Sequence, residues 1–215
     1  SAPRISPAVP TASTPCGADD DGDDRGDDGG ERSGRHRGAR HSRHIGAGDR
    51  TELEIHVPFS TDLDIEGISS DVTIEGVDGE ISLEVVSGDL EITGRLGELD
   101  IEVVSGDLTI NGTGHITDAE IEAVSGNVEF HSGLDPEASI SIETVSGDIE
   151  MFLSPETSCE VSAETFSGKI DSAYGDKPER ESRYVPSSSL RFTLGDGDAE
   201  VSLRTFNGDV DIRKE

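Results

Sequence analysis

Apolar and polar residues alternate with a period of two through most of the chain after residue 50, in short runs separated by Gly-containing turns. The clearest runs are VVSGDLEI at residues 85–92 and VVSGDLTI at residues 103–110, which begin eighteen residues apart. Alternation of this kind predicts β-strands with one buried face. A repeat of about 20 residues predicts a stack of similar layers, none of which can bury a core alone.

The copies align on a turn of the Ser-Gly-Asp type. The residue that opens the turn is Ser69, Ser87, Ser105, Ser125, Ser146, Ser167 or Asn207, with spacings of 18, 18, 20, 21, 21 and 40 residues. Six and four positions before this residue, and three and five positions after it, the side chains are mostly aliphatic. Each copy therefore predicts a rung of two short strands joined at a corner, where Gly allows a positive φ.

The predicted fold is all-β: a single-stranded parallel β-solenoid of the β-helix or β-roll type, with about seven to eight rungs of 18–21 residues and two short strands per rung. Rungs stacked in register place neighbouring strands about 4.8 Å apart. The composition, 31% hydrophobic and 4% aromatic, suits such a thin core. We expect Leu190, Phe192 and Leu194 to supply a degenerate rung before the last one, and residues 52–57 to add a strand at the start.

The chain divides where its composition changes. Residues 1–48 have few large aliphatic side chains and predict a disordered N-terminal arm, acidic at first and then basic, whereas residues 49–215 form the β-solenoid repeat domain. Within that domain, residues 174–189 are rich in charge and contain two prolines, which predicts an exposed insertion. The arm holds 8 acidic residues and 7 Arg, so nearly all of the net charge of −30 falls on the repeat domain. Such an anionic surface excludes nucleic acid as a partner and favours cationic ones.

Three further features bear on location. No run of 18 apolar residues occurs, so we expect no membrane-spanning helix. Cys16 and Cys159 lie in different regions and cannot form a disulfide framework. The opening SAPRISPAVP begins an arm rich in Pro, Ser and Thr, which predicts an extracytoplasmic protein, in the periplasm, at the cell surface or secreted, after removal of a leader that this sequence does not contain.

A glutamate recurs three residues before the turn, on the outward side of the strands. This series, named here the Glu ladder, consists of Glu66, Glu84, Glu102, Glu122, Glu143 and Glu164, and Arg204 ends it. Like charges on neighbouring strands repel, by on the order of 1 kcal/mol per pair in water. The Glu ladder is therefore a candidate cation-binding site.

Three arrangements would relieve this repulsion, and the sequence leaves them open. The side chains could splay into solvent with diffuse counterions. Ca²⁺ could bind between successive glutamates, because it prefers oxygen ligands from carboxylates and carbonyls. The basic segment ERSGRHRGARHSRH at residues 31–44 could lie across the ladder, more tightly as its His residues protonate near pH 6.

A second acidic series stands at the corners. It consists of Asp71, Asp89, Asp107, Asp148 and Asp209, with Asn127 and Lys169 in place of Asp in two copies. These side chains could share in cation binding, or they could bond the backbone amides of the turns. The sequence does not decide between these roles.

The VP strand entry, the tandem VSGDLEI-type rungs and the closing FTLGDGDAEVSLRTFNGDVDI resemble a bacterial adhesin-type domain of unknown function, also called the toast-rack β-helix family. The resemblance covers about residues 51–213. It implies a β-solenoid in the bacterial envelope or outside the cell that acts in adhesion or in sensing envelope stress. It implies no catalytic residues.

Signatures of the common enzyme classes are absent: the chain has no G-x-S-x-G, no H-E-x-x-H, no G-x-x-x-x-G-K-[ST] and no paired-cysteine zinc motif. We expect a non-catalytic binding or scaffold surface, with adhesion as the main hypothesis and an envelope-stress sensor that binds a cationic peptide or partner as the alternative. A polysaccharide lyase is the remaining enzymatic alternative. The expected partner is a cationic protein or cell-surface ligand, and exposed strand edges also allow edge-to-edge self-association.

Overall fold

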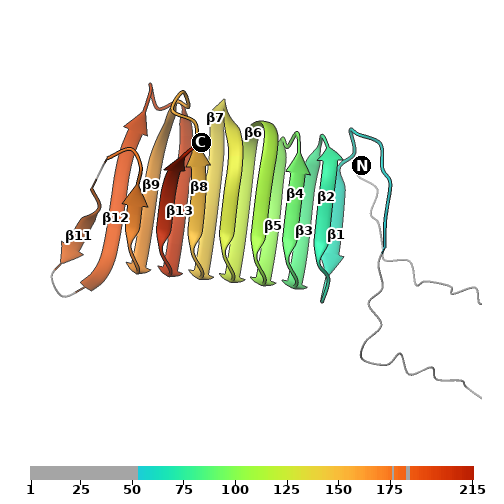
Figure 1. Ribbon diagram of the computed structural model, residues 1–215, viewed down its shortest axis with the longest axis horizontal. Helices are drawn as coiled ribbons and strands as arrows, with labels where there is room; N and C mark the ends of the chain where they lie inside the picture. The colour runs from blue at the N-terminus through green and yellow to red at the C-terminus, as the bar shows by residue number, and fades with distance from the viewer. Residues whose placement is uncertain (1–52, 176, 183–184) are drawn as a thin grey trace, which may run out of the picture. The chain divides into compact units, whose positions relative to one another are not determined.

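The computed structural model describes residues 53–175, 177–182 and 185–215 (Figure 1). Within these residues every regular element is a β-strand, and the strands form one 14-stranded sheet. The same residues include no helix long and apolar enough to cross a membrane. Strands pair in parallel except at one end, so the prediction of an all-β, largely parallel fold is confirmed. The predicted arm, residues 1–48, lies outside the described residues.

The sheet folds back on itself, so that its strands form two rows (Figure 1). In spatial order, the first row is β1 (Leu63–Gly67), β3 (Glu80–Ser87), β5 (Glu98–Ser105), the second halves of β6 (Leu108–Ser125) and β7 (Val128–Ser146), β13 (Ala199–Asn207), β9 (Cys159–Ser167), β12 (Val185–Leu194) and β11 (Glu179–Ser182). The second row is β2 (Val72–Val77), β4 (Leu90–Gly94), the first halves of β6 and β7, β8 (Ile149–Leu153), β14 (Val210–Lys214) and β10 (Ile170–Ser172). Strands β6 and β7 are long because each continues from the second row into the first.

Aliphatic side chains at alternate positions fill the space between the two rows. In β5, for example, Leu99, Ile101 and Val103 are buried, and the residues between them are exposed. Each rung repeats these positions, so that like side chains stack, as Ile92 does beside Ile110. The outward positions remain free to carry the polar and charged residues described below.

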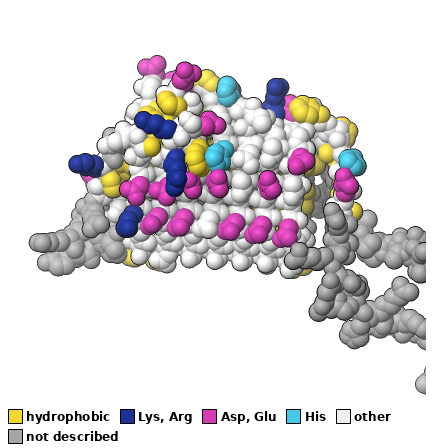
Figure 2. All heavy atoms as spheres, viewed as in Figure 1, with side chains coloured by type: hydrophobic (Ala, Val, Ile, Leu, Met, Phe, Trp, Pro, Cys, Tyr) yellow, Lys and Arg dark blue, Asp and Glu magenta, His cyan; other side chains and the backbone are white. Residues whose placement is uncertain are grey.

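Each corner is tied to the next by its Asp or Asn side chain. The amide of Asp107 donates to Asp89 Oδ1 at 3.1 Å, and the amide of Asn127 donates to Asp107 Oδ1 at 2.9 Å. The same bond joins Asp71 to Asp89, Asn127 to Asp148, Asp148 to Asp209 and Asp209 to Lys169. The side chains of the second acidic series therefore accept hydrogen bonds from the backbone amides of neighbouring corners. Acidic side chains form rows across the strands in Figure 2. Lys169 occupies the last corner of the described stack, where no further corner amide requires an acceptor.

The corner glycines are required because the backbone of the neighbouring corner lies against them. Gly126 has a φ of 144°, in the positive range that favours glycine. A Cβ on Gly126 would collide with the carbonyl oxygen of Gly106. The first corner carries Ser70 at the equivalent position, since no rung among the described residues lies on that side of it.

The rungs do not follow the order of the chain, which corrects the expectation of a stack in chain order. Residues 199–214, named here the C-terminal rung, consist of β13 and β14. Strand β13 pairs with β7 on one side and β9 on the other, and β14 pairs with β8 and β10. Leu190, Phe192 and Leu194 supply no intervening rung. They lie on β12, which runs antiparallel to β9 at the end of the sheet.

Two other segments differ in detail from expectation. The described part of the predicted strand at residues 52–57 forms no strand, and Leu53 and Ile55 are exposed. Alternation alone does not make a strand, because its amides and carbonyls need a partner. Within residues 174–189, the segment predicted as an exposed insertion, the structure places β11 and the first half of β12, where Ser188 is buried.

Cys159 starts β9 and is fully buried. Burial raises the pKa of its thiol from 9.0 to about 11. Burial of the neutral thiol contributes stability that is fully present below about pH 9 and is lost as the pH rises to about 11, because the Cys159 thiol ionises at lower pH in the unfolded chain than in the folded one. We predict that the free energy of unfolding, measured in urea at pH 8 and pH 11, falls by about 2 kcal/mol more in the parent than in Cys159→Ala. Equal declines in the two proteins would contradict this account.

Candidate binding groove

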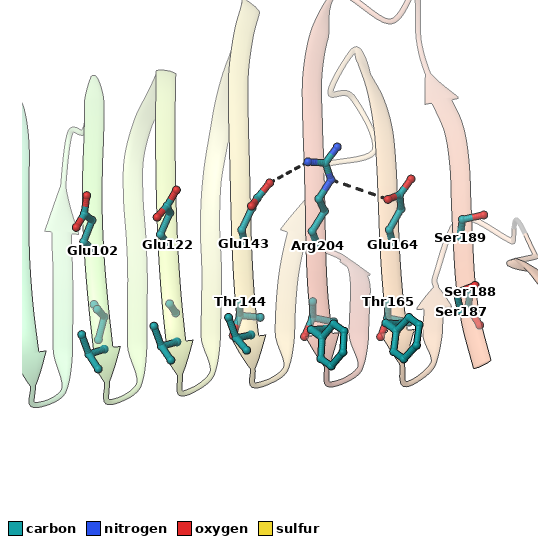
Figure 3. A pocket seen from close by; sticks show the side chains of 18 residues that line it. Glu102, Glu122, Glu143, Thr144, Glu164, Thr165, Ser187, Ser188, Ser189 and Arg204 are labelled. Atoms are coloured by element: carbon teal, nitrogen blue, oxygen red, sulfur yellow. Dashed lines mark hydrogen bonds and ion pairs between the residues drawn. The ribbon is translucent and has the colours of Figure 1, made fainter. Parts of the chain in front are cut away.

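A groove of about 580 Å³ runs along the outer face of the first row, from β5 to β12 (Figure 3). Three kinds of side chain dominate its lining. These are the charged residues Glu102, Glu122, Glu143, Glu164 and Arg204, the apolar residues Val104, Val124, Val145, Phe166 and Phe206, and the serines Ser187, Ser188 and Ser189. The repeat places the charged and the apolar residues in two rows across the strands, whereas the three serines lie along the single strand β12 (Figure 3).

The structure brings the Glu ladder together on this face. Consecutive members are Cα partners on neighbouring strands from Glu66 through Glu143. Four of the six glutamates line the groove, whereas Glu66 and Glu84 continue the row on β1 and β3 beyond it. Because the strands are parallel and in register, the carboxylates repeat at about 4.8 Å.

Arg204 does not end the Glu ladder, as the sequence suggested, but stands inside it. Since the C-terminal rung lies between β7 and β9, Arg204 is flanked by Glu143 and Glu164 (Figure 3). Its Nη1 donates to Glu143 Oε1 at 2.9 Å, and its Nε lies 3.9 Å from Glu164 Oε2. The expected run of six like charges is therefore a run of five, followed by Arg204 and Glu164. Glu102 and Glu122 have no cationic partner among the described residues.

An apolar stripe runs beside the Glu ladder, and the sequence analysis did not single it out. It consists of the residues just before the turn: Val86, Val104, Val124, Val145, Phe206 and Phe166 in spatial order. Val124 is 49% exposed and Phe206 is 51% exposed. The rings of Phe166 and Phe206 stack at 4.8 Å between centroids and 5° between planes. The doublets VV, AV, TV and TF before the turns carried the signal, because the second residue of each doublet lies at an outward position of its strand.

The two stripes are separated by one inward-facing position on each strand. Glutamate and apolar residue are two positions apart along the strand, which is about 7 Å. The groove thus offers a row of negative charge beside a parallel row of exposed apolar side chains. An extended surface of this kind matches a ligand that repeats both charge and apolar character along its length.

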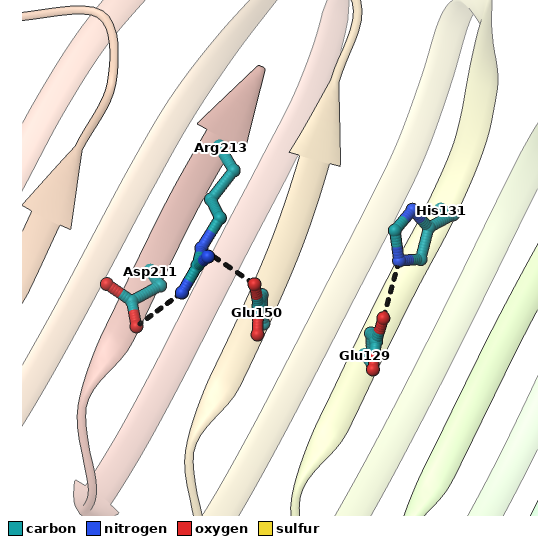
Figure 4. Close-up of polar contacts among 5 residues, drawn as sticks. All are labelled: Glu129, His131, Glu150, Asp211 and Arg213. Atoms are coloured by element: carbon teal, nitrogen blue, oxygen red, sulfur yellow. Dashed lines mark hydrogen bonds and ion pairs between the residues drawn. The ribbon is translucent and has the colours of Figure 1, made fainter. Parts of the chain in front are cut away.

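The outer face of the second row is also acidic, but its central carboxylates have partners (Figure 4). Arg213 Nε lies 2.7 Å from Glu150 Oε1, and its Nη2 lies 3.8 Å from Asp211 Oδ2. His131 Nε2 lies 2.7 Å from Glu129 Oε1. The groove differs from this face in that its unpaired carboxylates, those of Glu102 and Glu122, lie beside a row of exposed large apolar side chains.

Two hypotheses for relief of the Glu ladder remain predictions. Binding of Ca²⁺ between successive glutamates would use two side-chain carboxylates per ion, and in the part of the chain that the structure describes no group of three or more His, Cys, Asp or Glu side chains is placed to hold a metal. The basic segment at residues 31–44 lies outside the described residues.

One family of domains matches the segment that contains the repeated strands, the Ser-Gly-Asp corners and the closing strands. A model of the Toastrack DUF4097 family matches residues 61–213. The chain belongs to this family. Searches of curated proteins and of solved structures found no match to the chain. The Toastrack match covers the whole groove and all strands of both rows except the last residue of β14, and the family is one whose function is unknown.

Threonines at the inward position between the stripes offer a test of the Toastrack packing. Thr205 Oγ1 donates to the carbonyl of Gly147 at 3.1 Å, whereas the buried Thr144 Oγ1 has no hydrogen-bond partner in the described structure. Replacement by the isosteric Val removes a satisfied hydroxyl in one case and an unsatisfied one in the other. We predict that Thr144→Val raises the free energy of unfolding by about 1 kcal/mol and that Thr205→Val lowers it by a similar amount. Urea denaturation measures both, and shifts of the same sign would contradict the prediction.

Proposed function

We propose that this Toastrack chain is a non-catalytic binding module whose groove takes a cationic polypeptide segment that also carries apolar side chains. One observation carries the proposal. The carboxylates of Glu102 and Glu122, which have no cationic partner among the described residues, lie beside an exposed apolar stripe two positions further along each strand. Lys or Arg of the partner would lie between neighbouring glutamates and relieve their repulsion. Apolar side chains of the partner would cover Val124 and Val145, removing exposed hydrocarbon from water.

The same groove serves both hypotheses drawn from the sequence. An adhesin that holds a basic surface protein and an envelope sensor that detects a basic peptide would use the same two stripes. We also propose an extracytoplasmic setting, as the family resemblance implies, and a β-solenoid path whose C-terminal rung is out of chain order, as the strand register supports.

Titration with a synthetic Lys/Leu peptide of helical periodicity, followed by calorimetry, tests the proposal. We predict that replacing the two unpaired groove carboxylates together, as Glu102→Gln with Glu122→Gln, weakens binding about tenfold, or by about 1.4 kcal/mol. The reason is that each substitution removes one charge from the place where the peptide's cations lie. Val124→Ser, at an exposed position of the apolar stripe, is expected to weaken binding without changing the net charge.

The matched control removes two charges elsewhere. Glu75 and Glu91 are exposed residues of the second row, on β2 and β4, and lie outside the groove. The pair Glu75→Gln with Glu91→Gln is expected to change the affinity less than twofold. If both pairs weaken binding equally, the peptide responds only to net charge and the groove is not its site. A Lys/Ser peptide of equal charge that binds as well as the Lys/Leu peptide would remove the role of the apolar stripe.

A further inference from the structure

The C-terminal rung lies between two rungs that come earlier in the chain. On one side are β7 and β8, and on the other are β9 and β10. Among the described strands, β9 to β12 pair only with one another and with the C-terminal rung, never with β1 to β8. The C-terminal rung therefore fills a slot between two parts of the sheet, and it is the only paired link between them in the described chain.

The slot recognises the C-terminal rung along both walls. On one wall the amides of Gly147 and Ile149 donate to the carbonyls of Asn207 and Asp209 at 3.0 Å and 2.9 Å. On the opposite wall the amide of Val210 donates to the carbonyl of Lys169 at 2.8 Å. The core residues Val201, Leu203, Val210 and Ile212 are buried between the walls. Arg204 adds the ion pairs with both flanking glutamates on the outer face, so that the register of the rung is fixed by charge as well as by hydrogen bonds.

A short connection leads into this rung. Residues 195–198, with the sequence GDGD, join β12 to β13, and Gly195 and Gly197 have φ values of 58° and 78°. Ser158 Oγ accepts the amides of Asp196 and Gly197 at 2.9 Å and 3.0 Å. Because the rung comes last among the described strands, both walls of its slot are made of chain that precedes it. Insertion of the rung is therefore a distinct closing step that depends on the path of a four-residue loop.

We propose that the C-terminal rung exchanges between copies of this chain, each copy placing residues 199–214 in the slot of another. The slot is the same in every copy, so an exchanged rung makes all the contacts of its own rung. Only the path of residues 195–198 changes, which is the condition under which exchange of an element costs little. In the exchanged dimer each groove takes Arg204 and Phe206 from the other copy, since both belong to the C-terminal rung.

Disulfide trapping in full-length chains tests the exchange. Ser202 of β13 and Ser162 of β9 are Cα partners across one wall of the slot, and both side chains are partly exposed. Two chains with different tags, one carrying Ser202→Cys and the other Ser162→Cys, both in a Cys16→Ser background, are unfolded, mixed, refolded together and oxidised. A disulfide between the two chains requires the rung of one copy in the slot of the other. We expect a cross-linked heterodimer whose yield rises with protein concentration during refolding.

Two controls make every outcome informative. A mixture of the Ser202→Cys chain with a Ser82→Cys chain is expected to give at least tenfold less cross-link, because Ser82 holds the same position on β3, far along the row. A single chain with Ser162→Cys and Ser202→Cys, refolded at high dilution, is expected to close an internal disulfide. If the single chain closes its internal disulfide while the mixture gives no more cross-link than the Ser82→Cys control, exchange does not occur. If the single chain closes no internal disulfide, the register of the slot is wrong and the proposal fails with it.

Discussion

Replacing Gly126 by Ala is expected to lower the free energy of unfolding by at least about 3 kcal/mol. Gly126 forms a corner in the middle of the stack, with a φ of 144° that L side chains rarely adopt. The added Cβ would collide with the carbonyl oxygen of Gly106, which is backbone and cannot rotate away. Relief would require the two corners to separate, which would stretch the hydrogen bonds that join them, from the amide of Gly106 to the carbonyl of Ser125 and from the amide of Asn127 to Asp107 Oδ1.

Gly97→Ala is the matched control for this substitution. Gly97 lies between strands β4 and β5, has no positive φ, and a Cβ there would meet nothing within 4 Å. We expect its effect on stability to stay within about 0.5 kcal/mol. Thermal and urea unfolding of the two variants measures the difference. Similar small losses in both would mean that neighbouring corners are not packed as closely as the structure places them.

The contents of each rung could be predicted from the sequence because they depend on local rules. Alternation places Ile101 inward and Glu102 outward whatever lies beside them, and Gly in the turn marks the corner. These features recur in every copy, so one copy supports the interpretation of the next. The hydrogen-bonding role of the corner acids was one of two open alternatives, and only the register of neighbouring corners, as between Asp89 and Asp107, decided it.

The order of the rungs could not be predicted in the same way, because copies that share one register fit beside one another in any order. The sequence nevertheless contained clues at the ends of the stack. Ser70 replaces the corner Gly at the first corner of the described stack, and Lys169 replaces the corner Asp at the last one, beyond which no described corner amide follows. Arg204 is a third clue, since a cation is best placed between two members of a ladder of carboxylates.

The same limit explains what the sequence did and did not predict of the groove. The Glu ladder was visible because a repeated charge is unusual, whereas Val124 and Val145 were hidden beside the inward-facing residues Ala123 and Thr144. The stacked pair of Phe166 and Phe206 depends on rung order, since these residues are 40 positions apart in the chain and adjacent in the sheet. A groove formed across strands becomes visible only when the neighbours of each strand are known.

Rung order also predicts how a core substitution spreads. Leu203 is fully buried in β13, between Ile142 of β7 and Ala163 of β9. Leu203→Ala is expected to cost about 3 kcal/mol, because the small neighbour Ala163 cannot fill the resulting cavity. Since β9 to β12 pair with the rest of the sheet only through the C-terminal rung, we expect amide exchange to accelerate throughout β9 to β12 and not in β13 alone.

Ile101→Ala provides the comparison, because Ile101 occupies the same inward position in β5 and is equally buried. Its strand lies among rungs that follow chain order, and β9 to β12 do not depend on it for their pairing with the rest of the sheet. We expect a similar loss of stability but faster exchange in β1 to β6 and not in β9 to β12. Hydrogen exchange followed by mass spectrometry separates the two patterns. If Ile101→Ala loosens β9 to β12 as much as Leu203→Ala does, the domain opens as one cooperative unit, and the C-terminal rung has no special role in joining its two parts.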